Sequence, residues 1–389
     1  MKKELLQGID NFDFETLKNK KVALIANHTS VDKKGVSLVE KCLGNDVDIT
    51  AIFSLEHGYF PVAQDMECVG KENRIKDIPV FSLYGDDSSS LSPAPNLFQL
   101  FDAVIYDIQD IGARYYTYLA SLAMFMDRLN ETPRELIILD RINPVGGEIE
   151  GSLLDDTKYK SFVGYFPLCH RHGLTSAEAA MYYYKIKGYT FPVTDSELKG
   201  WERDSFFDDY DYQWMPTSPN MPCIDTAVLY PGACLLEGTE LSEGRGTTFP
   251  FHVAGAPDIN PFELKDELDS LSIPGLVFTP LEFRPMFQKH SMQRCGGVYI
   301  SVTDRKTLKP LRAFLRIIQV FRRILGDEKF FRVKPYEFIR NIPAIDLLLG
   351  DKVLTGLFRN FASFSEIDDY LKECEQISDD YFNQYRIYR

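Results

Sequence analysis

Short apolar runs alternate with helical periodicity along the first 140 residues, and this alternation limits the folds open to the chain. Apolar residues recur at helical spacing around 35–42 and over 115–129. The apolar runs cover residues 20–27, 47–53, 78–83, 101–106 and 135–139. Strands that alternate with helices favour a parallel sheet covered on both faces. We therefore predict an α/β fold, with a Rossmann-like parallel sheet in an N-terminal domain.

Polar or acidic residues follow or end four of these five predicted strands. They are Asn27, Glu56, Asp107 and Asp140. Ligands of open α/β sheets bind at the carboxyl ends of the strands, so we expect these side chains to meet in one pocket. A dinucleotide site is not expected there, because the residues after the first strand, 28–31, lack the G-x-G-x-x-G pattern.

Residues 106–118, YDIQDIGARYYTY, combine carboxylates, a guanidinium and aromatic rings directly after a buried strand. Rings can stack on the apolar faces of a sugar, while Asp107, Asp110 and Arg114 can hydrogen-bond its hydroxyls or an acidic substituent. This composition indicates a carbohydrate site. A salt-bridged junction between a strand and a helix explains the same residues without a ligand, because structural ion pairs also gather at such junctions.

The length of 389 residues predicts two domains. We place the boundary in the proline-rich segment 216–222, with a Rossmann-like catalytic domain over 1–222 and a smaller α+β domain over 223–389. Thr175 and Glu178 form a capping-box pattern that predicts a helix to about residue 187. In the second domain we expect strands near 275–279 and 297–303, and helices near 311–325 and 367–377.

Charge and composition exclude several classes of function. A formal net charge of −14 opposes binding to nucleic acid or an anionic membrane surface. No signal-peptide core or membrane-spanning run occurs, so we expect a cytoplasmic protein, or a periplasmic or exported one if a leader has been removed. Seven scattered cysteines and six histidines show no disulfide or metal-binding pattern, and we expect neither metal nor cofactor. The oligomeric state is left open.

Several motifs in a fixed order give the chain a more specific resemblance. They are SLEHG (54–58), YDIQDIGARYYTY (106–118), LDRINPVGG (139–147), HGLT (172–175), SPNMP (218–222), YPG (230–232) and EGTELSEGRGTT (237–248). Together they resemble the exo-β-N-acetylmuramidase family, from about residue 6 to near the C-terminus. Leu55 and Ile142 stand where that family more often has proline, and neither difference removes a reactive group.

The resemblance implies a glycoside hydrolase that releases N-acetylmuramic acid (MurNAc) from the non-reducing end of peptidoglycan fragments. Such fragments include the disaccharide with N-acetylglucosamine (MurNAc–GlcNAc), and the reaction would serve turnover and recycling of the cell wall. It also implies a site in the N-terminal domain near the domain interface. Two other functions stay open: a hydrolase of another carboxylate-bearing amino sugar, and a cell-wall saccharide-binding protein without catalysis.

Glycosidic cleavage needs an acid and, in most families, a second carboxylate. The resemblance and the position of Glu56 after a strand, beside His57 and Gly58, make Glu56 the expected acid. Asp107 or Asp140 is the expected assistant, because clustered carboxylates raise one another's pKa. The acetamido group of the substrate is an alternative nucleophile.

The lactyl carboxylate distinguishes the muramyl sugar from N-acetylglucosamine, and an arginine fork suits it. Arg114, Arg141 and Arg245 are the candidates, although Arg245 could instead pair with Glu237, Glu240 or Glu243. The other expected substrate contacts are Asn27, His57, Asp110, Tyr116, Asn143, His172, Ser218, Asn220, Tyr230 and Glu243. Core packing explains the tyrosines equally well, and turn formation or helix capping explains the small polar residues and His172.

Overall fold

A seven-stranded sheet forms the N-terminal part of the protein in a computed structural model that describes residues 2–64, 66, 67, 74–328 and 330–388. Its strands are β1 (Lys21–Ala26), β2 (Asp48–Ser54), β3 (Arg74–Ile75), β4 (Ile78–Ser82), β5 (Ala103–Asp107), β6 (Glu135–Leu139) and β7 (Val193–Ser196). The order is β3-β4-β2-β1-β5-β6-β7, and all neighbours are parallel except β3 and β4. The predicted α/β fold is confirmed, and β3 and β7 extend the five predicted strands.

Both faces of this sheet are buried, as its continuous apolar strands require. Ala23 and Ile25 of β1 belong to the core that α3 (Tyr118–Leu129) and α4 (Ser176–Lys187) enter. Val22 and Leu24, which alternate with them, belong to a second core with residues of α1 (Gly8–Asn11) and α2 (Leu38–Gly44). The predicted capping box at Thr175 opens α4.

A smaller α+β part follows, built around a three-stranded antiparallel sheet in the order β8-β10-β9. Its strands are β8 (Val253–Ala256), β9 (Leu276–Phe283) and β10 (Cys295–Val302). Its helices are α5 (Ile224–Ala233), η5 (Cys234–Gly238), α6 (Pro261–Ser270), α7 (Pro310–Leu325), α8 (Ala344–Leu349) and α9 (Lys352–Arg359). The predicted strands and the predicted helix at 311–325 are present, while β8 is too short to stand out in the sequence.

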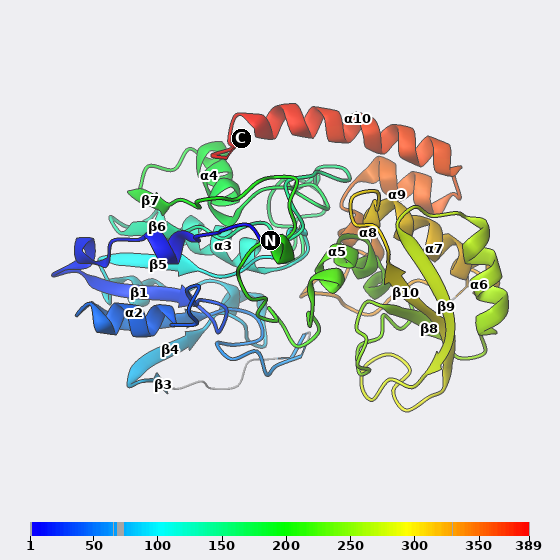
Figure 1. Cartoon of the computed structure of the whole chain (residues 1–389), viewed down its shortest axis with the longest axis horizontal. Coiled ribbons are helices and arrows are strands. Elements are labelled where there is room, and N and C mark those ends of the chain that lie inside the picture. Colours follow the sequence, from blue (N-terminus) through cyan, green and yellow to red (C-terminus); the bar gives the residue numbers. More distant parts are fainter. Residues whose placement is uncertain (1, 65, 68–73, 329, 389) are drawn as a thin grey trace.

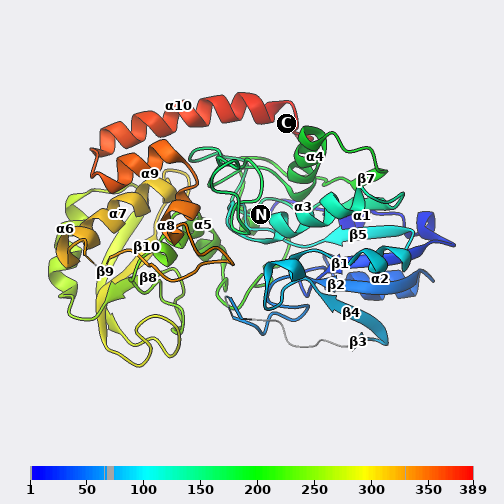
Figure 2. The same ribbon diagram turned by 180° about the vertical axis from the view of Figure 1, so that it is seen from behind.

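The end of the chain returns to the larger, N-terminal part of the protein. Helix α10 (Phe364–Asn383) runs along one side of the molecule from the smaller part to the larger (Figures 1 and 2). The Tyr388 hydroxyl donates to Asp140 Oδ2 over 2.8 Å, and the Ile387 amide donates to Glu178 Oε1 over 2.8 Å. The last residues therefore pack on the N-terminal part, although the predicted boundary assigns them to the second domain. No described helix is long and apolar enough to cross a membrane.

Candidate active site

Glu56 lies in the loop that follows β2, at the carboxyl edge of the sheet, and only 5% of it is exposed. His57 and Gly58 after it have φ values of 69° and 88°, which turn the chain sharply there. The Thr117 hydroxyl donates to Glu56 Oε2 over 2.5 Å. The Ala63 carbonyl lies 2.9 Å from His57 Nδ1 and fixes the ring. The turn and these contacts hold the carboxyl group in one orientation.

A cavity surrounds Glu56 where the sheet edge meets the smaller part of the protein. Side chains of both parts line it, and its free volume is about 30 Å³. That is room for about two water molecules. The sequence-predicted residues in its wall are Glu56, His57, Tyr116, Ser218, Tyr230 and Arg245.

Aromatic rings form one side of this cavity. The Tyr116 and Tyr230 rings meet edge to face with centroids 5.8 Å apart, and Tyr230 meets Phe251 in the same way at 4.9 Å. The Tyr116 hydroxyl lies 2.6 Å from Thr217 Oγ1. These contacts hold the rings in the wall, where an aromatic face can pack against the apolar face of a sugar.

Charged side chains from the smaller part also line this cavity, and the Arg245 guanidinium lies 4.9 Å from the centroid of the Phe251 ring. Arg245 pairs with Glu237 at 2.7 Å and with Glu243 at 3.3 Å, which is the ion-paired alternative that the sequence left open. Lys289 also pairs with Glu243, at 2.8 Å. Burial opposes ionisation of Glu243, but Lys289 and Arg245 outweigh it and lower its pKa to about 2. Arg245 lines the cavity, whereas Glu243 lies behind it.

Sequence reasoning did not place Thr117, Tyr336 or Glu337 in this wall. Thr117 holds Glu56, as described above. Tyr336 donates its hydroxyl to Glu237 Oε2 over 2.6 Å, and Glu337 accepts from the Tyr84 hydroxyl at 3.3 Å. Tyr336 and Glu337 lie about 280 residues after Glu56 in the sequence, and no local pattern links segments so distant.

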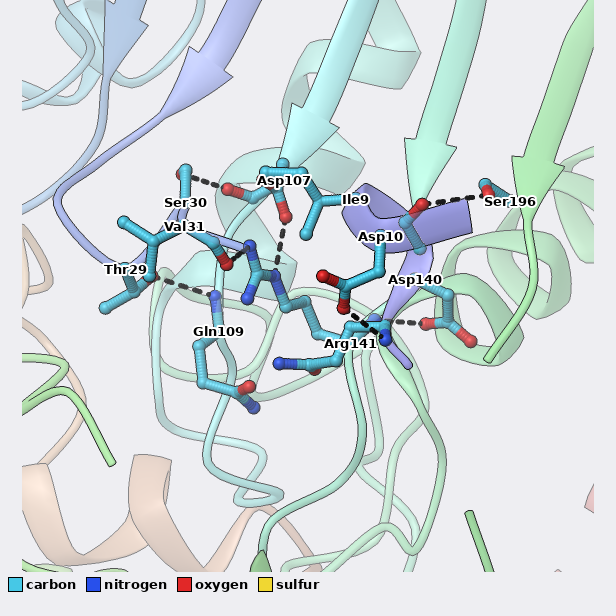
Figure 3. A network of polar contacts seen from close by, with 12 residues as sticks. Ile9, Asp10, Thr29, Ser30, Val31, Asp107, Gln109, Asp140, Arg141 and Ser196 are labelled. Carbon is cyan, nitrogen blue, oxygen red and sulfur yellow. Dashed lines mark hydrogen bonds and ion pairs between the residues drawn. The ribbon is translucent and has the colours of Figure 1, made fainter. Parts of the chain in front are cut away.

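Asp107 does not reach the cavity. It is the fully buried last residue of β5, and Arg141 Nε donates to its Oδ1 over 2.6 Å (Figure 3). The second Arg141 contact is from Nη2 to the Val31 carbonyl, at 3.1 Å. This buried ion pair connects the end of β5 to the loop after β6. Neither side chain lines the described cavity, which favours the salt-bridged junction over the expected roles of catalytic assistant and substrate contact.

Asp140 is likewise fully buried and serves the packing of α4 and the C-terminus. Its carboxylate accepts from the amide of Ala177, from the hydroxyls of Thr175 and Tyr388, and from the amide of Arg141, each over 2.8 Å. Burial raises its pKa to about 7. Asp140 is not in the described cavity wall, and its four donors favour a structural role over the expected acid pair with Glu56.

Arg114 holds backbone carbonyls of both parts of the chain. It donates to the carbonyls of Ser152 and Leu168 in the first part and to those of Leu348 and Leu349 at the end of α8, all at 2.9–3.0 Å. Burial lowers the pKa of this guanidinium. Arg114 therefore joins the two parts and is not available to read a lactyl carboxylate.

The remaining predicted contacts form turns beside the site. Asp110 Oδ2 accepts from the Gly112 amide at 2.7 Å and lies 3.3 Å from His172 Nε2. Asn143 donates to the Leu174 carbonyl at 3.0 Å, and Asn27 Oδ1 accepts from the Thr29 amide at 2.8 Å. Asn220 contacts Gln64 at 2.9 Å. These five side chains are not in the described cavity wall, which favours the turn-forming interpretation.

Metal-binding groups do not gather in the described part of the chain: no cluster of three or more His, Cys, Asp or Glu side chains could hold an ion there. The six described cysteines are all free thiols, and Cys68 lies outside the described residues. The site therefore offers carboxyl, hydroxyl, guanidinium and aromatic groups, which are the groups of an acid-catalysed reaction on a sugar.

Comparison with known proteins assigns the chain to a family. A family model described as exo-β-N-acetylmuramidase NamZ, N-terminal, matches residues 22–225, and the model of the C-terminal part matches residues 228–388. The chain belongs to the exo-β-N-acetylmuramidase family, a family of glycoside hydrolases. The peptidoglycan β-N-acetylmuramidase NamZ of Bacillus subtilis (strain 168) is 35% identical over 97% of this chain and 90% of that protein.

Two solved structures have the same fold as this chain. Both are DUF1343 family proteins from Bacteroides fragilis NCTC 9343, each 28% identical to this chain. One has a TM-score of 0.87 with 100% of both chains covered, and the other 0.79 with 99% of both covered. The fold seen here, with a parallel sheet followed by a smaller antiparallel one, is therefore shared with these two solved proteins.

Proposed function

We propose that this protein is an exo-acting β-N-acetylmuramidase that hydrolyses terminal non-reducing MurNAc from peptidoglycan fragments such as MurNAc–GlcNAc, in turnover and recycling of the cell wall. The observation that carries the proposal is the position of Glu56. It lies in a cavity between the two parts of the protein, together with two tyrosine rings and Arg245. The name of the Bacillus relative, a peptidoglycan β-N-acetylmuramidase, supports the same reaction.

In this proposal Glu56 donates a proton to the glycosidic oxygen. Arg245 binds the lactyl carboxylate, and Tyr116 and Tyr230 pack on the sugar ring. Glu237 orients Arg245 through their ion pair. The second group of the reaction is then Glu337, which lines the cavity, or the acetamido group of the substrate itself.

The test is the Glu56→Gln variant, assayed for release of MurNAc from a chromogenic muramide. Removal of a general acid costs about 10²- to 10⁴-fold in rate, so we expect the variant to lose nearly all activity while its thermal unfolding stays close to that of the wild type. The matched control is Glu131→Gln, because Glu131 is exposed just after α3. Full activity of Glu56→Gln would end the assignment.

The same assay separates the other two functions. A hydrolase of a different acidic amino sugar would cleave that sugar and leave the muramide intact. A binding protein would bind the muramide without releasing MurNAc. A muramidase, in contrast, should prefer the muramide over the matching glucosaminide, because the two differ only in the lactyl ether.

A further inference from the structure

A second, wider cavity lies beside the one that holds Glu56. It has a volume of about 470 Å³, within the range of small-molecule sites. Its basic side chains are Lys289, His290, Arg332 and Lys334, and its one acid is Glu240. We call it the basic groove. Because the protein has a formal net charge of −14, its overall composition does not explain why four basic side chains line one cavity.

Two of these cations lack a carboxylate partner. No ion pair involves Arg332 or Lys334 in the described part of the chain, and the one polar side-chain contact that Arg332 makes there is with Met66 Sδ, at 3.8 Å. His290 Nε2 lies 2.7 Å from the Glu240 carbonyl, so this nitrogen donates to it. The groove thus presents positive charge that the fold has not neutralised, which favours an anionic ligand.

Side-chain contacts connect the lining of the basic groove to the lining of the Glu56 cavity. Lys289 Nζ donates to the carbonyls of Leu236 and Leu241, at 2.9 and 2.7 Å, and pairs with Glu243, which itself pairs with Arg245. On the other side, the Arg332 guanidinium lies 5.5 Å from the centroid of the Tyr336 ring. The Tyr336 hydroxyl in turn binds Glu237 in the Glu56 cavity. These contacts place the groove next to the Glu56 cavity.

We propose that the basic groove binds the lactyl carboxylate of the next muramyl residue in a glycan chain. This inference rests on the proposed function. In an alternating glycan with MurNAc at its non-reducing end, the next carboxylate belongs to the third sugar. Arg332 and Lys334 then form charge-assisted hydrogen bonds with it. The enzyme consequently favours longer glycans over the disaccharide, and recognises them by the charge on the third sugar.

Two tetrasaccharides that differ only at the third sugar test this directly. One is MurNAc–GlcNAc–MurNAc–GlcNAc, and the other has GlcNAc in the third place. We expect kcat/KM to be about fivefold higher for the first, which corresponds to about one kcal/mol. In the double variant Arg332→Gln/Lys334→Gln we expect this ratio to fall to about one. A control, Lys265→Gln/Arg323→Gln, removes two cations from α6 and α7 and should keep the ratio.

A binding measurement distinguishes failure of the groove proposal from failure of the proposed function. Calorimetry with the Glu56→Gln variant compares the affinities for the two tetrasaccharides without turnover, with and without the two groove substitutions. Equal affinities, or a preference that survives the Arg332→Gln/Lys334→Gln substitutions, would overturn the role of the groove. If the wild type cleaves none of the muramides but Glu56→Gln still shows the charge-dependent preference, the proposed function fails and the groove stands.

Discussion

The hydroxyl of Thr117 donates to Glu56 Oε2 over 2.5 Å and so connects the loop after β2 to the start of α3. Thr117 is the N-cap residue of α3, yet its side chain makes no capping hydrogen bond. A threonine at this position ordinarily accepts from the helix backbone, which stabilises the helix by about 1 kcal/mol. Here the hydroxyl is directed to the carboxyl group instead, so Thr117 is a positioning residue for the proposed acid.

Replacing Thr117 with Val should therefore lower kcat more than it changes KM. The two side chains have the same shape, and the lost hydrogen bond to a carboxyl group is worth about 1.5–3 kcal/mol, or roughly a 10- to 100-fold fall in kcat. Thr117→Ser keeps the donor and should recover most of the rate. Steady-state kinetics on a chromogenic muramide give both constants. A Thr117→Val enzyme with the wild-type kcat would show that this contact has no part in catalysis.

Arg245→Gln should weaken the preference for muramides over glucosaminides, because Arg245 is the only one of the three candidate arginines that lines the described cavity. The same change leaves Glu237 and Glu243 without this cation and should lower the free energy of unfolding by about 3 kcal/mol. The ratio of kcat/KM for the two substrates measures the first effect, and urea unfolding measures the second. Arg245→Lys keeps the charge, so its substrate ratio and its free energy of unfolding should lie between those of the wild type and those of Arg245→Gln.

Arg114→Gln is the matched control for this experiment. It also removes a buried guanidinium and should destabilise the protein, since four backbone carbonyls lose their donor. At a temperature where both variants are folded, its substrate ratio should equal that of the wild type. A changed ratio in Arg114→Gln would mean that loss of rigidity alone explains the Arg245 result.

Much of the fold and part of the site follow from the sequence. Apolar runs and helical spacing predict five strands of the sheet and the capping box of α4, because these signals are local. The strand-end argument finds Glu56, which lies two residues beyond β2. It fails for Asp107, which is still inside β5 and therefore points into a buried layer. A position near a strand end predicts that a residue lies close to the sheet edge. The direction of its side chain depends on its exact position relative to the end of the strand.

Arginine partners are equally hard to predict. Arg114 and Arg141 follow strand ends, as a substrate contact would, but the fold encloses them with carbonyls and a carboxylate. Tyr336 and Glu337 also line the site, and they belong to the smaller part of the protein, far along the chain from Glu56. Their contribution depends on how the two parts pack together, and a single sequence carries no record of that packing.

Glu337→Gln decides between the two candidates for the second catalytic group. If Glu337 acts as base or nucleophile, its loss should reduce kcat by about 10²-fold or more. If the acetamido group of the substrate attacks instead, the variant should retain most of its rate. A substrate with a trifluoroacetamido group, a poorer nucleophile, should then be cleaved more slowly by wild type and variant alike. The paired measurement gives opposite results for the two mechanisms.

The stability contributed by Glu243 should depend on pH. Its pKa is about 2 in the folded protein, against 4.5 for the unperturbed side chain. Above pH 4.5 the full contribution is present, about 3 kcal/mol from the pKa difference, and it is lost as the pH falls from 4.5 towards 2. The gap in unfolding free energy between wild type and Glu243→Gln should therefore narrow between pH 5 and pH 3. A gap that stays constant over this range would contradict the ion pairs with Lys289 and Arg245.

Cys223 should react as a thiolate near neutral pH. It is the exposed N-cap residue of α5, and its Sγ lies 4.0 Å from His252 Nε2 and 3.3 Å from Thr226 Oγ1. His252 Nδ1 lies 3.2 Å from the Ile300 carbonyl and donates to it, which fixes the ring with Nε2 towards the thiol. The hydrogen bond with His252 outweighs burial and lowers the pKa of Cys223 to about 7.

Alkylation with iodoacetamide, followed on the Cys223 peptide by mass spectrometry, measures this pKa. We expect a half-maximal rate near pH 7 in the wild type. In His252→Phe, which keeps a ring beside Tyr299, the midpoint should move towards the usual value of about 8.5, and the rate at pH 7 should fall about fivefold to tenfold. Cys223→Ser should remove the labelled peptide without affecting release of MurNAc. Equal midpoints in wild type and His252→Phe would mean that the imidazole does not act on this thiol, and that its reactivity comes from exposure alone.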